Sequence, residues 1–111
     1  MPAALVPDDV RPSESVVDLA SVAPDGSFDV APGSVGFYVP PYMGPRATME
    51  NIAALPGLQV VQLLTAGYES ALPFLPPGVV LCNAAGVHDA STAELTVGLI
   101  LASLRGIDDF A

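Results

Sequence analysis

The amino-acid sequence predicts an α/β fold built on a parallel sheet. Short apolar runs rich in β-branched residues recur along the chain, and each one ends in Gly, Pro, Asp or a polar turn. Segments of helical character lie between these runs and after the last of them. Strands that alternate with helices are typical of parallel sheets, in which ligands collect outside the carboxyl ends of the strands. We therefore expect the functional loops to lie along one edge of the sheet.

The first third of the chain begins with an apolar run at residues 3–6, which predicts a buried strand closed by Pro7. A short helix is expected to begin at Ser13 and to stop at Pro24. Four apolar residues would share one side of this helix: Val16, Val17, Leu19 and Val22. Apolar and polar residues then alternate over residues 27–31, which predicts a short strand.

Three further strands and one helix are predicted in the middle of the chain. The strands occupy residues 35–39, 58–64 and 79–82, and the second is followed by a tight turn at 65–68. Residues 69–75 are expected to be irregular or to form one helical turn. The helix is expected over residues 48–55, and four of its residues would face inward: Met49, Ile52, Ala53 and Leu55.

The last helix is the most distinctive element of the sequence. Ser91 and Glu94 have the spacing of a capping box, and Asp89 adds negative charge near the positive end of the helix dipole. The segment that follows is apolar on most of its circumference, which is typical of a helix packed against several neighbours. A helix from Thr92 to Asp108 would span roughly 25 Å. We expect this helix to dock on a partner that the sequence does not contain.

Composition excludes several classes of function. The formal net charge is −9, and Arg11, Arg46 and Arg105 are the only Lys or Arg residues. A phosphate backbone requires a basic footprint, so we expect no nucleic-acid partner and no binding to an anionic membrane. No apolar run reaches the ~18 residues of a membrane span, and no signal peptide is recognisable. Cys82 is the only cysteine, which predicts a buried, inert thiol in a cytoplasmic protein.

An ordered set of motifs resembles the N-terminal part of D-isomer-specific 2-hydroxyacid dehydrogenases. A strand runs into an Ala-Gly turn at Ala66-Gly67, and a G-V-x-x-x-N strand begins at Gly78. A helix start of the form G-x-x-x-x-x-T-A-E begins at Gly86, and an L-x-x-x-R end is reached at Arg105. The resemblance covers roughly residues 35–110 well, whereas residues 1–34 match only as a strand-first beginning.

The resemblance implies a flavodoxin-like parallel sheet with flanking helices that ends in a long apolar interdomain helix. Residues 1–90 would form the N-terminal part of a substrate-binding domain, and residues 91–111 would form the interdomain helix. The dinucleotide-binding domain, which would bring NAD or NADP, is expected to be absent from this chain, because no G-x-G-x-x-G motif occurs in it. The family's catalytic Arg, Glu and His would lie downstream. We therefore expect the chain alone to be inactive and to bind no cofactor.

The resemblance also assigns site residues. The backbone amides of Thr65, Ala66 and Gly67 would hold the carboxylate of a 2-oxo acid, as successive amides form a small anion site. Asn83 would lie near the substrate, although capping of a turn by its side chain is an equal alternative. The other two candidates are Tyr42, in the substrate's side-chain pocket or in loop packing, and Thr92, on the cofactor side or in helix capping.

Other polar residues receive structural interpretations. His88 is the only histidine, and we interpret it as a residue of the loop before the last helix, because it has no catalytic partner at a recognisable spacing. Glu94 is interpreted as a capping residue. Glu69 would disfavour an anionic substrate unless its carboxylate faces solvent. One His and one Cys offer no recognisable metal-ligand set, so no metal is expected.

Two hypotheses about function follow. The first is a substrate-binding fragment of an NAD(P)-dependent oxidoreductase that acts on small D-2-hydroxy or 2-oxo acids. The second is a stand-alone, non-enzymatic α/β binding or interaction module that dimerises through its last helix. Under either hypothesis we expect a homodimer, because monomers rarely tolerate an exposed apolar patch of this size.

Overall fold

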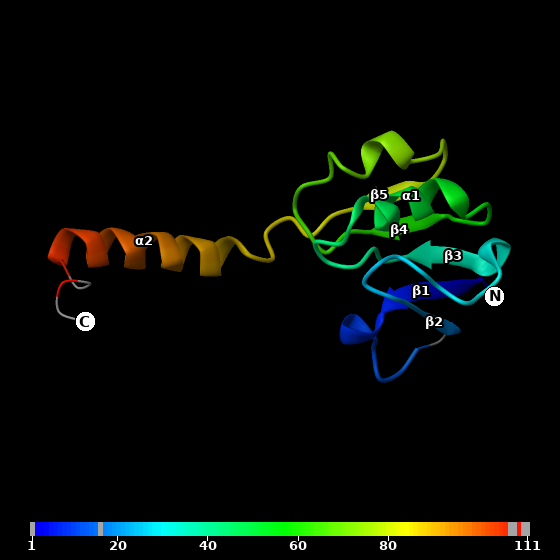
Figure 1. Ribbon diagram of the computed structural model, residues 1–111, viewed down its shortest axis with the longest axis horizontal. Helices are drawn as coiled ribbons and strands as arrows, with labels where there is room; N and C mark the ends of the chain where they lie inside the picture. Colours follow the sequence, from blue (N-terminus) through cyan, green and yellow to red (C-terminus); the bar gives the residue numbers. More distant parts are fainter. Residues whose placement is uncertain (1, 16, 107–108, 110–111) are drawn as a thin grey trace.

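The computed structural model of the chain describes residues 2–15, 17–106 and 109, and its centre is a five-stranded parallel sheet (Figure 1). The strand order is β2-β1-β3-β4-β5. The strands are β1 (Ala3–Pro7), β2 (Leu19–Val22), β3 (Val35–Tyr38), β4 (Val60–Gln62) and β5 (Val80–Cys82). This arrangement confirms the predicted α/β class and is consistent with a flavodoxin-like fold.

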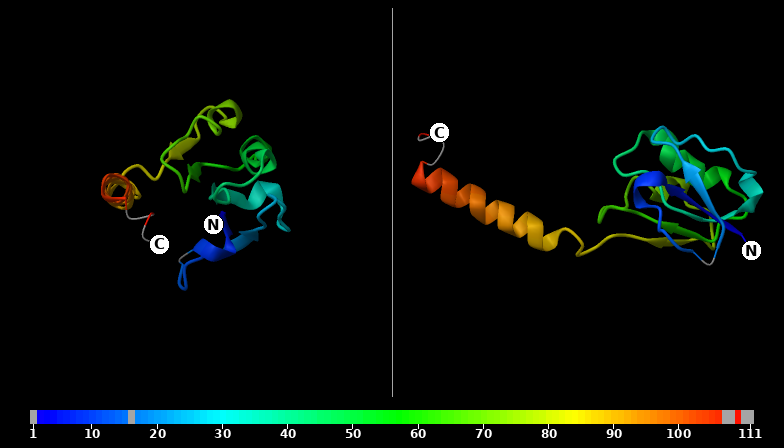
Figure 2. Two further views of the ribbon diagram at one scale, coloured as in Figure 1. Left: turned by 60° about the vertical axis from the view of Figure 1, so that its left-hand side comes forward. Right: turned by 90° about the horizontal axis from the view of Figure 1, so that it is seen from below.

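One face of the sheet carries the main core. Helix α1 (Arg46–Ala54) and the 3₁₀ turn η3 (Leu72–Phe74) lie together on this face (Figures 1 and 2). The core beneath them comprises Leu5, Val22, Val35, Tyr38, Ile52, Leu55, Leu58, Val61, Leu63 and Ala71. Strand residues that point to this face, such as Leu5 and Val61, meet Ile52 of α1 there, because successive side chains of a strand point to opposite faces.

Helix α1 turns a different set of residues inward than the sequence pattern indicates. Ile52 and Leu55 are buried and Met49 is half-buried, as expected, but Ala53 is exposed. Thr48 takes the inward position instead, and its hydroxyl donates a 2.7 Å hydrogen bond to the Pro45 carbonyl. This internal hydrogen bond satisfies the hydroxyl, which makes its burial acceptable.

The opposite face of the sheet has no helix among the described residues. A small cluster of Ala4, Val6 and Val39 lies here, with Val17, Leu19 and Leu64 packed against it. The side chains of Phe37 and Val80 on this face are 37% and 56% exposed. Parallel sheets are nearly always covered on both faces, so the second face of this sheet lacks its usual layer.

The segment before β3 differs most from prediction. The short helix expected between Ser13 and Pro24 is wrong, because residues 19–22 form β2 and pair with β1. Two of the four residues assigned to one side of that helix, Leu19 and Val22, lie in β2 instead, where pairing with β1 overrides the helical spacing. The strand expected at residues 27–31 is reduced to one antiparallel bridge between Val22 and Phe28. Val16 lies outside the described residues.

The second half of the sheet agrees better with the sequence. The predicted strands at residues 35–39, 58–64 and 79–82 appear as β3, β4 and β5, and the expected helical turn appears as η3. Because β5 is an edge strand, its residues are less buried than predicted: Leu81 and Cys82 are only half-buried. The Cys82 thiol is therefore partly accessible, which corrects the prediction of a fully buried one.

Helix α2 (Asp89–Arg105) projects away from the sheet, and the described structure measures 57 × 31 × 23 Å (Figures 1 and 2). None of its residues is buried. Its six large apolar side chains are 53–78% exposed: Leu95, Val97, Leu99, Ile100, Leu101 and Leu104. Helix α2 is thus exposed along its whole length in the described structure, and its docking on a partner outside the sequence stays a prediction. None of the described helices is long and apolar enough to cross a membrane.

The ends of α2 correct the predicted capping. The helix begins at Asp89, after a turn in which Gly86 has φ +83°, so Ser91 already lies inside the first turn. The Ser91 hydroxyl donates to the His88 carbonyl at 3.1 Å, and no side chain caps the helix start. The capping box of Ser91 and Glu94 is therefore wrong. At the other end Gly106 closes the helix at φ 61°, a common helix terminator. Ile107 and Asp108, which the sequence placed in this helix, lie outside the described residues.

Tyr38 provides a test of the core. Its hydroxyl donates to the Thr48 carbonyl at 2.7 Å and accepts from Asn51 Nδ2 at 3.2 Å, and burial raises the pKa of Tyr38 to about 12. The protonated phenol is favoured in the folded state, so its stabilising contribution is complete below pH ~10 and is lost as the pH rises towards about 12. We expect Tyr38→Phe to lower the free energy of unfolding by about 1 kcal/mol at pH 7 and by less at pH 11.

Urea unfolding of both proteins at the two pH values measures this difference. The chain contains no lysine, so few other groups titrate in this range. An equal loss of stability between pH 7 and pH 11 in the Tyr38→Phe variant and in the parent protein would contradict the assignment to Tyr38.

Candidate functional site

The loops that follow the parallel strands meet at one edge of the sheet, as the sequence predicts. These are η1 (Asp8–Val10) after β1, residues 39–45 after β3, residues 63–68 after β4 and residues 83–88 after β5 (Figure 1). Ligands of open α/β sheets bind at this edge. All the predicted substrate-binding residues lie on these loops.

The turn at Thr65, Ala66 and Gly67 has the properties of an anion site. Within the described part of the chain, the backbone amides of Ala66 and Gly67 donate to no acceptor. The Thr65 hydroxyl donates to the Gly67 carbonyl at 2.7 Å and holds the turn closed. Gly67 does not have positive φ, so its conformation does not require glycine. Two amides without partners at a strand end are the donors that a carboxylate needs.

Asn83 connects this turn to the neighbouring loop. Its Nδ2 donates to the Ala66 carbonyl at 2.9 Å, and its Oδ1 accepts from the Ala85 amide at 3.3 Å. The Ala84 amide also donates to the Thr65 carbonyl at 2.9 Å. Of the two interpretations of Asn83, this geometry supports a turn-stabilising role that positions the Thr65–Gly67 loop. Direct contact of Asn83 with a substrate stays a prediction.

Glu69 lies at the same turn. Its Oε2 accepts a hydrogen bond from the Tyr68 amide at 3.1 Å, and a Cβ on Gly67 would lie 3.2 Å from that oxygen. The Glu69 side chain is exposed to solvent. The carboxylate thus occupies the Tyr68 amide and leaves the amides of Ala66 and Gly67 free.

Tyr42 and Asn83 line one cavity together. This cavity has a volume of about 590 Å³ and lies between the ends of β1, β3, β4 and β5. Asp9 and His88 also line it. The structure therefore brings two predicted site residues together and places His88, the residue immediately before α2, beside them.

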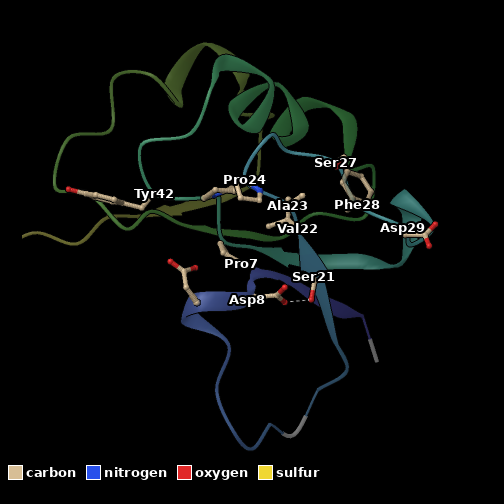
Figure 3. Close-up of a pocket in the computed structure, with 12 residues that line it drawn as sticks. Pro7, Asp8, Ser21, Val22, Ala23, Pro24, Ser27, Phe28, Asp29 and Tyr42 are labelled. Atoms are coloured by element: carbon tan, nitrogen blue, oxygen red, sulfur yellow. Dashed lines mark hydrogen bonds between the residues drawn. The ribbon is translucent and has the colours of Figure 1, made fainter.

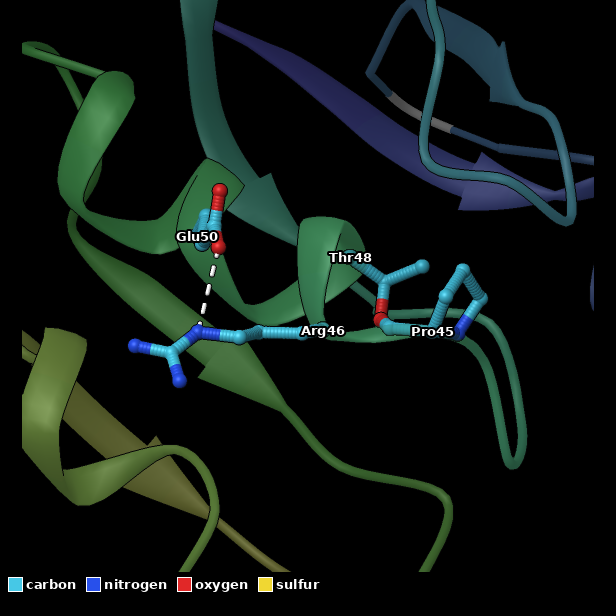
Figure 4. Close-up of polar contacts among 4 residues, drawn as sticks. All are labelled: Pro45, Arg46, Thr48 and Glu50. Carbon is cyan, nitrogen blue, oxygen red and sulfur yellow. Dashed lines mark hydrogen bonds and ion pairs between the residues drawn. The ribbon is translucent and has the colours of Figure 1, made fainter.

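Thr65 borders a second cavity, with a volume of about 500 Å³, which also contains Arg46. The Arg46 guanidinium lies 5.4 Å from the centroid of the Phe74 ring, and its Nε donates to Glu50 at 3.2 Å. Figure 4 shows this guanidinium on the side of α1 opposite to Thr48. The ion pair is mostly exposed, so it contributes little and can be exchanged for another anion. Arg46 supplies positive charge beside the Thr65 turn.

A third cavity, of about 790 Å³, lies at the ends of β1, β2 and β3, where Tyr42 again forms part of the wall (Figure 3). Three carboxylates line it: Asp8, Asp9 and Asp29. The Ser21 hydroxyl donates to Asp8, which holds that carboxylate in the wall. An acidic cavity disfavours an anionic ligand. No group of side chains suited to a metal ion is present among the residues that the structure describes.

Thr92 lies in the first turns of α2 and is exposed. Its amide donates to the His88 carbonyl at 3.0 Å, and its carbonyl accepts from the Thr96 hydroxyl at 2.8 Å. Capping by Thr92 is wrong, because the helix begins before it. Thr92 lines none of the three cavities at the sheet edge. Its contact with a cofactor stays a prediction.

Among solved structures, the comparison finds an enzyme with a similar fold. No protein-family model matches the chain, and no curated protein sequence matches it. A D-isomer-specific 2-hydroxyacid dehydrogenase from Xanthobacter autotrophicus Py2, crystallised in complex with NADPH and MES, superimposes with a TM-score of 0.65 at 19% sequence identity. The match covers 98% of this chain and 38% of the dehydrogenase. The similarity shows a shared fold, and the chain spans well under half the length of that enzyme.

Sequence reasoning missed Arg46 and the acidic cavity. Arg46 follows a Gly-Pro pair at the start of a helix, next to a strand end, and this position was the available signal. The sequence pattern gave Asp8 and Asp9 no role in a site. The sequence positions of these residues do not indicate which loops lie together, and only the fold shows this.

Proposed function

We propose that this chain is part of the substrate-binding domain of an NAD(P)-dependent oxidoreductase that acts on small 2-hydroxy or 2-oxo acids. The observation that carries the proposal is the turn at residues 65–67. The amides of Ala66 and Gly67 have no acceptor among the described residues, and Thr65 lines a cavity together with Arg46. The similarity in fold to a 2-hydroxyacid dehydrogenase supports the same class of reaction.

The charge distribution selects one position for the carboxylate of such an acid. Asp8, Asp9 and Asp29 make the cavity at the β1 end repulsive to anions. At the turn after β4 the amides of Ala66 and Gly67 have no acceptor among the described residues, and Arg46 lines the cavity that Thr65 borders, while the exposed Glu69 carboxylate lies at the same turn and would have to stay turned to solvent. With its carboxylate held at the turn of residues 65–67, a short 2-oxo acid would direct its carbonyl carbon away from the sheet.

The residues of this chain would bind and orient the substrate, and a nucleotide held by a separate domain would supply the hydride. Asn83 would act as a positioning residue, because it fixes the Ala66 carbonyl and so orients the amides of the turn. The catalytic acid, base and arginine would come from outside these 111 residues. The chain alone is therefore expected to bind the substrate and not to turn it over.

Two apolar surfaces that are uncovered in the described structure support the proposal that this chain is part of a larger protein. The sheet face that carries Phe37 and Val80 has no covering layer among the described residues, and α2 has no buried residue. A segment that returned to the sheet would cover the first surface, and a nucleotide-binding domain would cover part of the second. Both coverings would remove apolar area from water, which contributes roughly 25 cal/mol per Å².

Titration of the isotope-labelled chain with pyruvate, followed by amide NMR, tests the proposed binding site. We expect the Ala66 and Gly67 amides to shift most, and the uncharged methyl ester of pyruvate to cause no comparable shift. Arg46→Gln should weaken binding about tenfold, the effect of one charge-assisted hydrogen bond of ~1.4 kcal/mol. Arg105→Gln, at the far end of α2, is the matched control and should leave binding unchanged. Equal shifts with the ester would contradict an anion site.

The mass of the native protein in its own cells tests the assignment to an enzyme. A product about three times the size of this chain should oxidise NADH or NADPH in the presence of glyoxylate, hydroxypyruvate or pyruvate. A product of 11.3 kDa would favour the second candidate, a non-enzymatic binding module, which the exposed apolar surface of α2 also fits.

A further inference from the structure

The cavity of about 590 Å³ at the sheet edge adjoins the turn at residues 65–67. Leu64 lines this cavity and is followed directly by Thr65. Asn83 also lines it, and its Nδ2 donates to the Ala66 carbonyl at 2.9 Å. A 2-oxo acid whose carboxylate is held by the amides of the turn would therefore have this cavity within reach of its side chain.

The side-chain amides that line the cavity are already hydrogen-bonded within the protein. Gln62 Nε2 donates to the Leu63 carbonyl at 2.9 Å and to the Asn83 carbonyl at 3.2 Å. The Nδ2 and Oδ1 atoms of Asn83 bond to the Ala66 carbonyl and the Ala85 amide. Because these groups have partners, the cavity wall offers few donors to a polar substituent of the substrate.

Apolar side chains from three loops form much of the remaining wall. Val10 follows β1, Leu64 follows β4 and Val87 follows β5. Val10 and Val87 are 41% and 68% exposed, so both keep apolar surface in contact with water. Covering this surface with an apolar group favours binding. The volume lies within the range of roughly 300–1,000 Å³ that is usual for small-molecule sites, and the methyl group of pyruvate would fill little of it.

The charges around the cavity disfavour a second carboxylate on the substrate. Asp9 lines it, and among the described residues of its wall there is no Lys or Arg. Asp9 also lines the neighbouring acidic cavity, together with Asp8 and Asp29. Arg46 lines a different cavity, the one that Thr65 borders. The positive charge therefore lies where the first carboxylate is expected, and the negative charge lies where the side chain of the substrate would extend.

We propose that this cavity holds the side chain of the 2-oxo acid and selects a branched, uncharged apolar side chain over a methyl group or a second carboxylate. Val10, Leu64 and Val87 are the residues that determine this specificity by contact, and Asp9 determines it by repulsion. The inference rests on the proposed function, because it takes the carboxylate position from the turn at residues 65–67.

Titration of the isotope-labelled chain with three 2-oxo acids tests the selection, with amide NMR as the readout. The acids are pyruvate, 4-methyl-2-oxopentanoate and 2-oxoglutarate, of which the last two have side chains of similar size but different charge. At pH 8 imidazole groups are mostly neutral, which leaves Asp9 as the charged group of the cavity. We expect 4-methyl-2-oxopentanoate to bind about tenfold more tightly than pyruvate, the lower end of the effect of an added methylene group in an apolar pocket. 2-Oxoglutarate should bind more weakly than pyruvate.

Two substitutions in exposed loops separate the contributions of contact and charge. Val87→Ser should weaken the binding of 4-methyl-2-oxopentanoate about fourfold, the effect of roughly one buried CH₂ group, and leave the affinity for pyruvate unchanged. Asp9→Asn should strengthen the binding of 2-oxoglutarate about fivefold and leave that of 4-methyl-2-oxopentanoate unchanged. Val97→Ser, in α2 and outside the cavity, is the matched control and should change none of the three affinities.

The outcomes distinguish a failure of this inference from a failure of the proposed function. If no 2-oxo acid shifts the Ala66 and Gly67 amides, the proposed function fails and the inference fails with it. If the acids shift these amides with equal affinity, or if 2-oxoglutarate binds most tightly, the inference alone is overturned. Tightest binding of 2-oxo-5-guanidinopentanoate would overturn it in favour of a cationic side chain. An unchanged affinity of Val87→Ser for 4-methyl-2-oxopentanoate would place the side chain outside this cavity.

Discussion

Leu5→Ala is expected to lower the free energy of unfolding by about 3 kcal/mol, a large share of the stability of a domain this size. Leu5 lies in β1, next to the centre of the sheet, and its side chain is completely buried in the core under α1. The substitution removes buried apolar atoms and leaves a cavity that the surrounding strands cannot fill. Urea unfolding followed by tyrosine fluorescence measures the loss, because Tyr38 lies in the same core.

The same substitution at Leu104 is the matched control. Leu104 lies in α2 with 78% of its side chain exposed, so Leu104→Ala should change the free energy of unfolding of the sheet by less than about 0.5 kcal/mol. Comparable losses at the two positions would show that α2 packs on the sheet in solution, contrary to the structure.

Gly26→Ala is expected to destabilise the protein by about 2–3 kcal/mol, for two reasons that act together. Gly26 has φ +93°, a conformation that alanine rarely adopts. An added Cβ would also lie 3.2 Å from the Thr48 amide nitrogen and 3.3 Å from the Ala47 carbonyl carbon. These are backbone atoms of α1, so the strain cannot be relieved by rotating a side chain.

Gly33→Ala serves as the control for this prediction. Gly33 has no positive φ, and an added Cβ there meets no atom within 4 Å. We expect its midpoint in urea to stay the same or to rise slightly, because alanine reduces the entropy of the unfolded chain. A Gly26→Ala variant as stable as Gly33→Ala would show that the loop before β3 can move away from α1.

The central and C-terminal strands were predictable because their sequences combine high β-propensity with clear ends. Residues 58–64 carry an apolar run that fits only a strand between the Pro-Gly pair before it and the turn after it. The segment around Leu19 was mistaken for a helix, because four apolar residues at helical spacing outweighed the strand preference of valine. The pairing of β2 with β1 is a tertiary interaction that no local pattern contains.

The site was predictable only in part. The sequence located the turn at residues 65–67 and Asn83, and the fold brings both to the ligand-binding edge. It did not locate Arg46, whose relevance depends on its lying beside Thr65 in space. The capping interpretation of Ser91 failed because the turn at Gly86 starts the helix earlier than the S-x-x-E spacing indicates.

The turn that precedes α2 makes the helix a lever. The 17 residues of α2 extend about 25 Å beyond the turn at residues 85–88, so a rotation of only ~10° in that turn moves the far end of the helix by about 4 Å. Gly86, at φ +83°, is the residue of this turn with the least steric restriction. A ligand that binds beside His88, which lines the cavity at the sheet edge, would therefore contact the turn about which α2 rotates. Small local changes there would be converted into large displacements of whatever surface α2 carries.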